Sequence, residues 1–157
     1  METGKQLQIK AKLKIQKPAH QVFEAIADPA LMANYFIAQS TGRMEEGATL
    51  YWQFPEFEMQ FPVRVQKVES DKYLSFLWDD VDGTQTKVEI TLEPKGDNDT
   101  LVQVTEGIKE NNELGVQWLA RNTEGWANFL ACLKAFLEYG INLRKGAFDS
   151  SQLPEKE

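Results

Sequence analysis

The stretch NELGVQWLARNTEGWANFLACLKAFLEY, residues 112–139, decides the fold. It contains no proline, and its apolar residues recur at the spacing of one helix face. The stripe consists of Leu119, Trp126, Leu130, Leu133 and Leu137, widened by Trp118, Phe129 and Phe136. A helix of this length measures roughly 30–40 Å, and Gly140 is a suitable residue to end it. The stretch therefore predicts one long helix with a wide apolar face.

The chain before this helix changes to a period of two from Gln39 to Gly107. Apolar and polar residues alternate in successive runs at residues 49–54, 59–66, 74–78, 88–92 and 102–104. Residues typical of turns separate these runs, so we expect antiparallel strands that follow one another and share one buried face. Because Pro62 cannot donate a ladder hydrogen bond, we expect a bulge or a sheet edge at that position.

The first part of the chain predicts a strand followed by two short helices. Residues 7–15, LQIKAKLKI, alternate with period two and place lysines on the wet face of a half-buried strand. Lys17-Pro18 suits the start of a helix, which must break at Asp28-Pro29 because a residue before proline avoids the helical conformation. Asp28 can cap a second helix that runs from residue 29 to about residue 35.

The composition excludes several classes of protein. With one cysteine and one histidine among 157 residues, the chain can form neither an internal disulfide nor a Cys/His zinc site. Its 17 Lys and Arg against 24 Asp and Glu give a net charge of −7, so nucleic acid and anionic membranes are poor partners. No apolar run approaches the roughly 18 residues of a membrane span, and the first residues form no apolar leader. We expect one cytoplasmic domain over residues 1–157, ordered at about 5–145 and frayed at 150–157, without metal or cofactor.

Four segments resemble a family of known fold: VFEAIADPALMANYF (22–36), GRMEEGATLYWQF (42–54), YLSFLWDD (73–80) and EGW (124–126). With the predicted order of elements, they are similar to the START-like SRPBCC superfamily, and within it to the family of the activator of the heat-shock-protein-90 ATPase. The resemblance covers roughly residues 10–139. It implies an α+β helix-grip fold, in which a curved antiparallel sheet of about seven strands surrounds the C-terminal helix and two short helices follow the first strand.

The sequence departs from this family at two places. Tyr35-Phe36 stands where the family usually has a tryptophan, and Glu46-Gly47 stands where it usually has two glycines. Both departures concern the mouth of the expected pocket rather than the fold.

The expected fold provides a place for a ligand. A curved sheet around one helix leaves a hollow if the facing side chains do not fill it, and this superfamily commonly encloses an apolar chamber. Asn122 interrupts the apolar stripe of the long helix. Glu106 follows Val102 and Val104 at every second position of a predicted strand, so its side chain is expected to point inward with theirs. The expected ligand-binding residues are Trp52, Phe54, Met59, Phe61, Phe76, Trp78, Glu106, Trp118, Asn122 and Trp126. The alternative is that the same apolar side chains form a plain core.

Few other residues suggest chemistry. No residue is assigned as catalytic, and Glu106 is the acid–base candidate if it is buried without a cation. His20 is expected on the surface, and Cys132 is expected to pack as a small apolar residue. The aspartates of segment 79–82 do not have the spacing of a calcium loop and are interpreted as a solvated turn. On the outer face of the sheet we expect Tyr51, Tyr73, Leu77 and Leu101, which suggests contact with a second copy or another protein.

Three functions remain open. The favoured hypothesis is a non-catalytic module that binds a small apolar or amphipathic molecule between the sheet and the long helix. The second is an enzyme of the polyketide cyclase or hydrolase type, in which Glu106 or Tyr35 acts on the bound substrate. The third is a chaperone-associated interaction protein of the stress response, which uses the outer sheet face and the acidic surface.

Overall fold

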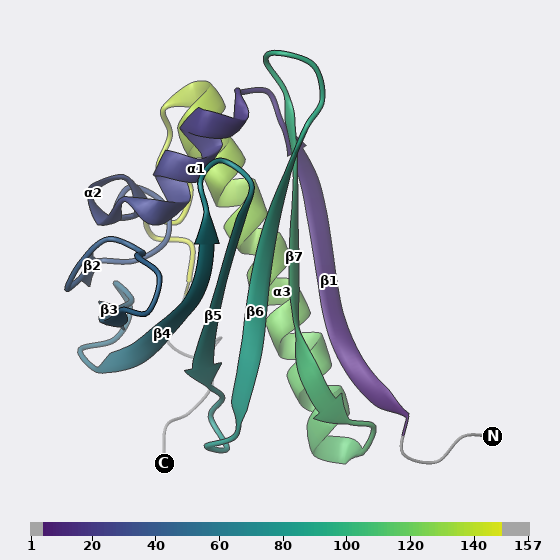
Figure 1. Cartoon of the computed structure of the whole chain (residues 1–157). Coiled ribbons are helices and arrows are strands. Elements are labelled where there is room, and N and C mark those ends of the chain that lie inside the picture. The colour runs from purple at the N-terminus through teal and green to yellow at the C-terminus, as the bar shows by residue number, and fades with distance from the viewer. Residues whose placement is uncertain (1–4, 149–157) are drawn as a thin grey trace.

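A computed structural model describes residues 5–148 of the chain; the expected frayed end at 150–157 lies outside the described residues. The strands pair in the order β1-β7-β6-β5-β4-β3-β2, and all neighbours are antiparallel. This arrangement confirms the α+β helix-grip fold (Figure 1). In chain order, the elements are β1 (Gln6–Ile15), α1 (Ala19–Ala27), α2 (Pro29–Met32), β2 (Gln39–Ser40), β3 (Thr49–Gln53), β4 (Gln60–Glu69), β5 (Tyr73–Asp79), β6 (Gln85–Pro94), β7 (Thr100–Glu110) and α3 (Glu113–Tyr139).

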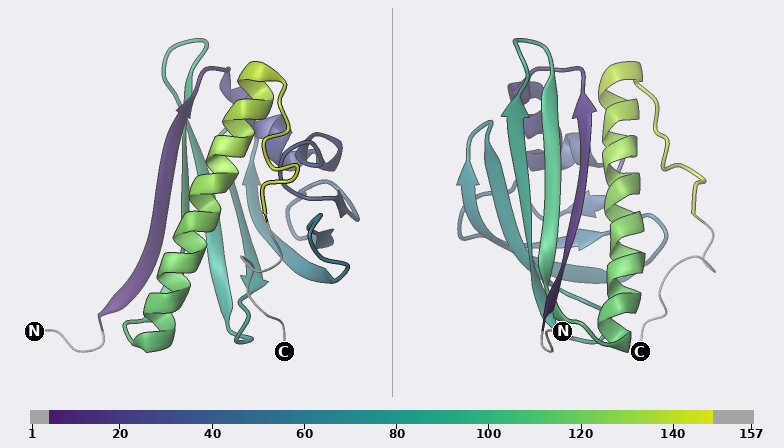
Figure 2. Two further views of the ribbon diagram at one scale, coloured as in Figure 1. Left: turned by 180° about the vertical axis from the view of Figure 1, so that it is seen from behind. Right: turned by 90° about the vertical axis from the view of Figure 1, so that its right-hand side faces the viewer.

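The long helix α3 lies against one face of the sheet and packs mainly on β1 (Figure 2). It begins where the Asn112 side chain accepts a hydrogen bond from the Gly115 N–H at 2.8 Å. It ends at Gly140, whose φ of 67° is readily adopted by glycine. The predicted range of 112–139 is therefore confirmed. Within the described residues, no helix combines the length and apolar character that crossing a membrane requires.

The second short helix is shorter than predicted. Asp28 caps α2 by accepting a hydrogen bond from the Ala30 N–H at 2.9 Å, but the helix ends at Met32 rather than near residue 35. The Asn34 amide donates to the carbonyl oxygens of Ala30 and Leu31, at 3.0 and 3.2 Å, and so occupies acceptors at the end of the helix. The chain can then turn and place the next two aromatic residues in the core.

Pro62 lies where β4 has a partner on one side. It is paired with Tyr51 of β3, whereas the pairing of β4 with β5 begins at Arg64. The expected sheet edge is not found, because β4 lies between β5 and β3; Pro62 instead stands two residues before the pairing with β5 begins, where the ladder needs no N–H from it. The bulge of this strand lies further along, between Val65 and Lys67.

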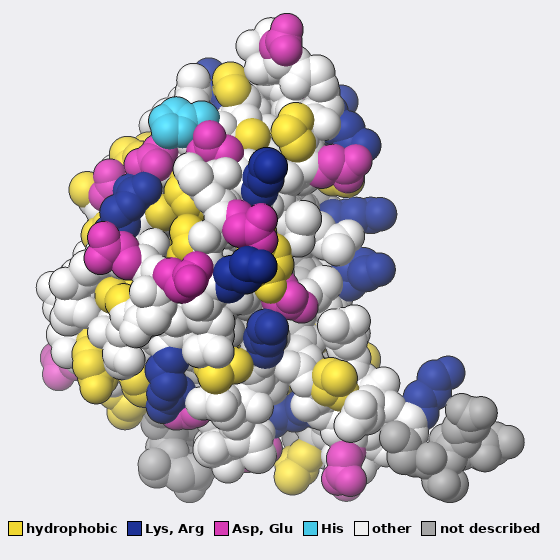
Figure 3. All heavy atoms as spheres, in the orientation of Figure 1, with side chains coloured by type: hydrophobic (Ala, Val, Ile, Leu, Met, Phe, Trp, Pro, Cys, Tyr) yellow, Lys and Arg dark blue, Asp and Glu magenta, His cyan; other side chains and the backbone are white. Residues whose placement is uncertain are grey.

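The outer face of the sheet carries charged side chains of both signs and separate apolar patches (Figure 3). Tyr51 is 45% exposed, and Tyr73, Leu77 and Leu101 are half-buried. The hydroxyl of Tyr73 donates to Glu89 of β6 at 2.5 Å, so this ring already has a polar partner. Contact of this face with a second copy or another protein stays a prediction.

Candidate functional site

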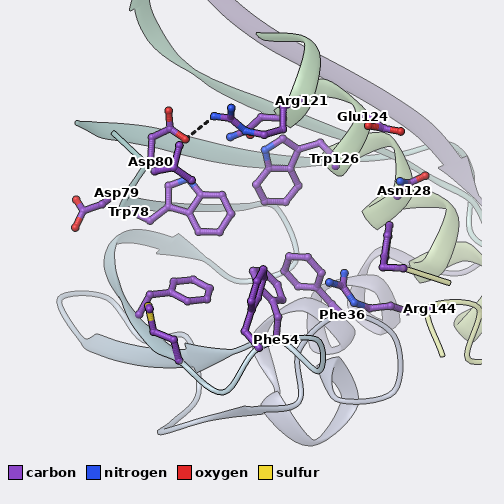
Figure 4. A pocket seen from close by; sticks show the side chains of 17 residues that line it. Phe36, Phe54, Trp78, Asp79, Asp80, Arg121, Glu124, Trp126, Asn128 and Arg144 are labelled. Atoms are coloured by element: carbon purple, nitrogen blue, oxygen red, sulfur yellow. Dashed lines mark hydrogen bonds and ion pairs between the residues drawn. The ribbon is translucent and has the colours of Figure 1, made fainter. Parts of the chain in front are cut away.

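A pocket of about 280 Å³ opens between the β3–β5 part of the sheet, helix α3 and the segment after α3. Its apolar wall consists largely of aromatic rings: Phe36, Phe54, Phe57, Phe61, Trp78 and Trp126. Figure 4 shows the indoles of Trp78 and Trp126 on one side of the pocket and Phe36 and Phe54 on the other. The hollow on which the favoured hypothesis depends is therefore present in the structure.

Strand and helix periodicity explain why these residues meet. Trp78 ends the inward row of β5, and Phe61 continues the inward row of β4. On α3, Asn122 and Trp126 are four residues apart and therefore lie on one helix face. Gly125 lies beside them, and a Cβ atom added there would meet no atom within 4 Å.

Glu106 of β7 is the buried polar centre of this region. Its side chain points inward as predicted, and the residue is 1% exposed. Oε2 accepts from Trp78 Nε1 at 2.9 Å and from Thr86 Oγ1 at 2.6 Å. Oε1 accepts from Trp126 Nε1 at 2.8 Å and from Asn122 Nδ2 at 3.2 Å. Asn122, which breaks the apolar stripe of α3, thus serves a carboxylate of the sheet.

The four donors match the acceptor capacity of a carboxylate. Three of the four donors are N–H groups that cannot accept a hydrogen bond, and an ionised carboxylate only accepts. Its two oxygens have about four acceptor positions, and the structure gives it four donors. The donors come from β5, β6 and α3, so one side chain connects the sheet with the helix.

The predicted ligand-binding residues fall into two layers. The pocket is lined by Phe54, Met59, Phe61, Trp78, Asn122 and Trp126. Trp52, Phe76 and Trp118 do not reach the lining and are at most 1% exposed. Trp52 packs behind the wall, with ring centroids 5.4 Å from Phe76 and 6.2 Å from Trp78. Glu106 also lies behind the wall and holds two of its rings.

The interpretation of segment 79–82 as a solvated turn is wrong for Asp80. Its side chain is 6% exposed and accepts from Lys109 Nζ at 2.7 Å and from Arg121 Nη2 at 2.9 Å. Lys109 also binds Asp82, and although burial opposes the charged form, the hydrogen bonds to Asp80 and Asp82 raise the pKa of Lys109. These partners lie on β7 and α3, so the local sequence of the turn could not indicate them.

The segment after α3 closes another side of the pocket. Arg144 forms a two-pronged ion pair with Glu56, with Nη2 and Nε at 2.7 and 3.1 Å from its oxygens. These side chains are only 12% and 13% exposed. The guanidinium also lies 4.9 Å from the ring centre of Phe54 and 4.7 Å from that of Phe148. Sequence reasoning missed this segment, because 88 residues separate Arg144 from Glu56.

Other lining residues also escaped the sequence analysis. On α3, the polar residues Arg121, Glu124 and Asn128 line the pocket with spacings of three and four. The sequence could have indicated these lining residues, because they form a polar row next to the apolar stripe of the helix. The lining residues Phe36, Phe57, Val81 and Phe148 lie outside regular helices and strands, where periodicity gives no orientation.

The groups that could act in a reaction are engaged or inaccessible. The Tyr35 hydroxyl donates to the Ala25 carbonyl at 2.8 Å, and burial raises the pKa of Tyr35 well above its ordinary value. Burial also raises the pKa of the Cys132 thiol, which is in the core as predicted. His20 is exposed as predicted, with Nδ1 at 3.0 Å from Asp71. Within residues 5–148, no group of three His, Cys, Asp or Glu residues is placed to hold a metal ion.

Comparisons with known proteins extend these observations. Residues 16–138 match the family model of Activator of Hsp90 ATPase homolog 1-like proteins. The crystal structure of SSP2350 from Staphylococcus saprophyticus is similar with a TM-score of 0.77 and 28% identity, over 88% of this chain and 96% of that one. DynU16, a protein of the dynemicin biosynthetic locus, has a TM-score of 0.74 and 25% identity, over 85% of this chain but 48% of its own.

A third similar structure is the solution structure of the Aha1 dimer from Colwellia psychrerythraea. It has a TM-score of 0.71 and 20% identity, over 85% of this chain and 98% of that one, and so it supports the fold. Among curated proteins, no sequence is a significant match.

Proposed function

Starting from the fact that the chain belongs to the family of Activator of Hsp90 ATPase homolog 1-like proteins, we propose that it binds a small apolar or amphipathic molecule without transforming it. The observation that carries this proposal is the aromatic-walled pocket of about 280 Å³ between the sheet and α3. Small-molecule sites are typically concave, mostly apolar and supplied with a few placed polar groups. This volume is close to the lower end of such sites, roughly 300 Å³, and suits a molecule of two or three fused rings.

The wall of the pocket is organised before any ligand arrives. The Trp78 and Trp126 ring centres are 5.5 Å apart, and both indole N–H groups are held by Glu106. Their apolar ring atoms are therefore fixed toward the cavity rather than free to collapse into it. Preorganisation of this kind lowers the entropy cost of binding, which supports a binding function.

The hydrogen bonds of Glu106 and Tyr35 favour binding over catalysis. A general base must offer a free acceptor to the substrate proton, and the carboxylate of Glu106 already receives four donors. Tyr35 is 1% exposed and donates its hydroxyl to a backbone carbonyl. The origin of DynU16 in a biosynthetic locus supports a small organic molecule as the partner, for this chain as for that protein.

Gly125 allows a sharp test of the proposal. Gly125→Leu places a side chain into the open space of the pocket, while Gly125→Ala adds one methyl group and serves as the matched control. Both changes improve helix propensity by up to about 1 kcal/mol, so neither should impair folding. Binding of 2-naphthalenemethanol and 1-decanol would be measured by calorimetry and by the indole N–H signals of the four tryptophans.

We expect saturable binding that moves the indole signals of Trp78 and Trp126 but not that of Trp118. Gly125→Leu should weaken binding at least about tenfold, and Gly125→Ala should change it less than about threefold. If neither compound binds, or if Gly125→Leu binds like the unmodified protein, the pocket is not the site.

We also propose self-association through the outer sheet face as the second property of this chain. The dimeric state of the Colwellia neighbour supports it, as does the exposure of Tyr51. Sedimentation should show a concentration-dependent dimer that Tyr51→Lys weakens. A monomer at all concentrations would refute it.

A further inference from the structure

We propose that the pocket is selective for the charge of its ligand: it favours an aromatic or amphipathic molecule that carries an ammonium group and disfavours carboxylates. This inference rests on the binding function proposed above and names the ligand class. It follows from the carboxylate behind the wall, from the pairing of the arginines in the lining and from the carboxylates at the mouth.

The first charge is that of Glu106. All four of its hydrogen-bond donors are neutral groups: two indoles, one hydroxyl and one amide. Within the described residues, no ion pair reaches this carboxylate, although the residue is 1% exposed. The wall formed by Trp78 and Trp126 therefore has a buried carboxylate directly behind it, all of whose direct partners are neutral.

The cations of the pocket are already paired. Arg121 Nη2 lies 2.9 Å from Asp80, and Arg144 is held by both oxygens of Glu56. The carboxylate partners are 6% and 13% exposed, so a ligand carboxylate would meet arginines whose charge is already balanced. Each pair offsets the positive charge of its arginine, although the bonds use only Nη2 and Nε and leave Nη1 of both side chains to other acceptors.

Two further carboxylates line the mouth, and one of them is paired with a cation. Glu124 lines the pocket from α3 and is exposed. Asp79 lines it from β5 and lies 3.6 Å from Arg64, in a pair whose side chains are 41% and 37% exposed. Because solvent screens exposed charges, these two groups should contribute less than Glu106.

The aromatic wall suits a cation as well. The guanidinium of Arg144 already lies against the rings of Phe54 and Phe148, so this pocket holds a positive group of its own chain on aromatic surface. Donation of the indole N–H groups to a carboxylate also increases the electron density of both indole rings. A ligand ammonium in contact with these rings would lie about one ring width, roughly 6–8 Å, from Glu106.

The test compares three compounds of one shape: 2-naphthylmethylammonium, 2-naphthalenemethanol and 2-naphthoate. Calorimetry on the unmodified protein gives their dissociation constants at low salt and at about 0.5 M salt. We expect the ammonium compound to bind at least about tenfold more tightly than the carboxylate, with the alcohol between them. The preference should persist in part at high salt, because a buried charge is screened less than an exposed one.

The outcomes separate this inference from the proposed function. If the alcohol binds but the ammonium compound is no tighter than the carboxylate, the charge selectivity is wrong and the binding function stands. If none of the three binds, both fall. These comparisons need no variant, so they hold even if a substitution at Glu106 impairs folding.

Variants then locate the source of the preference. Glu106→Gln, checked for folding by its indole signals, should reduce the ratio between the ammonium and carboxylate constants at least about threefold. Glu110→Gln, on the same strand but exposed and outside the pocket lining, should change that ratio less than twofold or so, and Glu124→Gln at the exposed rim should change it less than Glu106→Gln does. A preference that disappears with Glu124→Gln and survives Glu106→Gln would overturn the assignment to the buried carboxylate.

Discussion

Replacing Glu106 with glutamine should lower the free energy of unfolding by about 2–4 kcal/mol, although the shape of the side chain barely changes. Glutamine has one acceptor oxygen and one donor amide, whereas the site presents three N–H donors and one hydroxyl. The best arrangement keeps the oxygen where Trp126 and Asn122 donate and turns the amide toward Thr86, whose hydroxyl can accept. Trp78 Nε1 then has no acceptor.

The magnitude follows from this arrangement. One buried donor left without a partner costs about 1–3 kcal/mol, and the remaining bonds lose the extra strength that the charge gives them. Because glutamine is neutral, the variant no longer has to bury a carboxylate charge, and this offsets part of the loss. The same reasoning predicts that the Trp78 indole signal shifts more than that of Trp126, because only Trp78 loses its acceptor.

Urea denaturation measures the difference, with Glu110→Gln as the matched control. Glu110 is on the same strand but exposed, so its substitution should change the free energy of unfolding by less than about 0.5 kcal/mol. A Glu106→Gln protein within about 1 kcal/mol of the unmodified one, or a larger shift at Trp126 than at Trp78, would refute the reasoning.

Three further predictions concern other parts of the molecule. Because burial raises the pKa of the Cys132 thiol, a disulfide reagent should modify the native protein at least about 100-fold more slowly than the urea-unfolded protein; similar rates would contradict its burial. The hydrogen bonds of Thr84 lower the pKa of Asp82 from 3.8 to about 2, so their stabilising contribution should be complete above about pH 4 and disappear as the pH falls toward 2. In urea denaturation, Asp82→Asn should therefore lose less stability on acidification, and an equal loss would exclude this assignment. Glu56→Gln removes the ionic partner of Arg144, so amide exchange in residues 142–148 should accelerate several-fold; unchanged exchange would show that the ion pair does not hold the segment.

Most of the fold could be predicted because its determinants are local. Period-two rows define the strands, and a stripe with two clear ends defines α3, which begins after the Asn112 cap and ends at Gly140. The exception is α2, where the side chain of Asn34 takes the carbonyl oxygens at the helix end. That competition between a side chain and the next helical turn does not appear in apolar periodicity.

The candidate site could be predicted only in part. The alternation of side chains along a strand correctly predicted Phe61, Trp78 and Glu106 on the inner face of the sheet, because successive residues point to opposite faces. This alternation does not tell how far below the pocket surface a side chain lies. Trp52 and Phe76 were therefore expected beside a ligand, although they pack behind the wall. Depth depends on the curvature of the sheet and on the side chains across the gap.

The ion pairs around the pocket could not be predicted for a different reason. Arg144 meets Glu56, and Arg121 meets Asp80, across 88 and 41 residues of sequence. No local pattern encodes such a pair, because each partner alone looks like an ordinary surface charge. The segment after α3 therefore became part of the pocket only once the structure brought it there.

The pocket persists because polar groups hold its walls at fixed positions where the two layers separate. Apolar rings alone would close such a gap, since closer packing removes more surface from water. Glu106 prevents this by binding one indole from the sheet and one from the helix, so that neither Trp78 nor Trp126 can swing across the pocket toward the opposite wall without giving up a buried hydrogen bond. An apolar residue in its place would leave both indole N–H groups buried without partners. The buried carboxylate is therefore better explained by the shape and polarity of the pocket than by stability, which is also what the proposed charge selectivity requires.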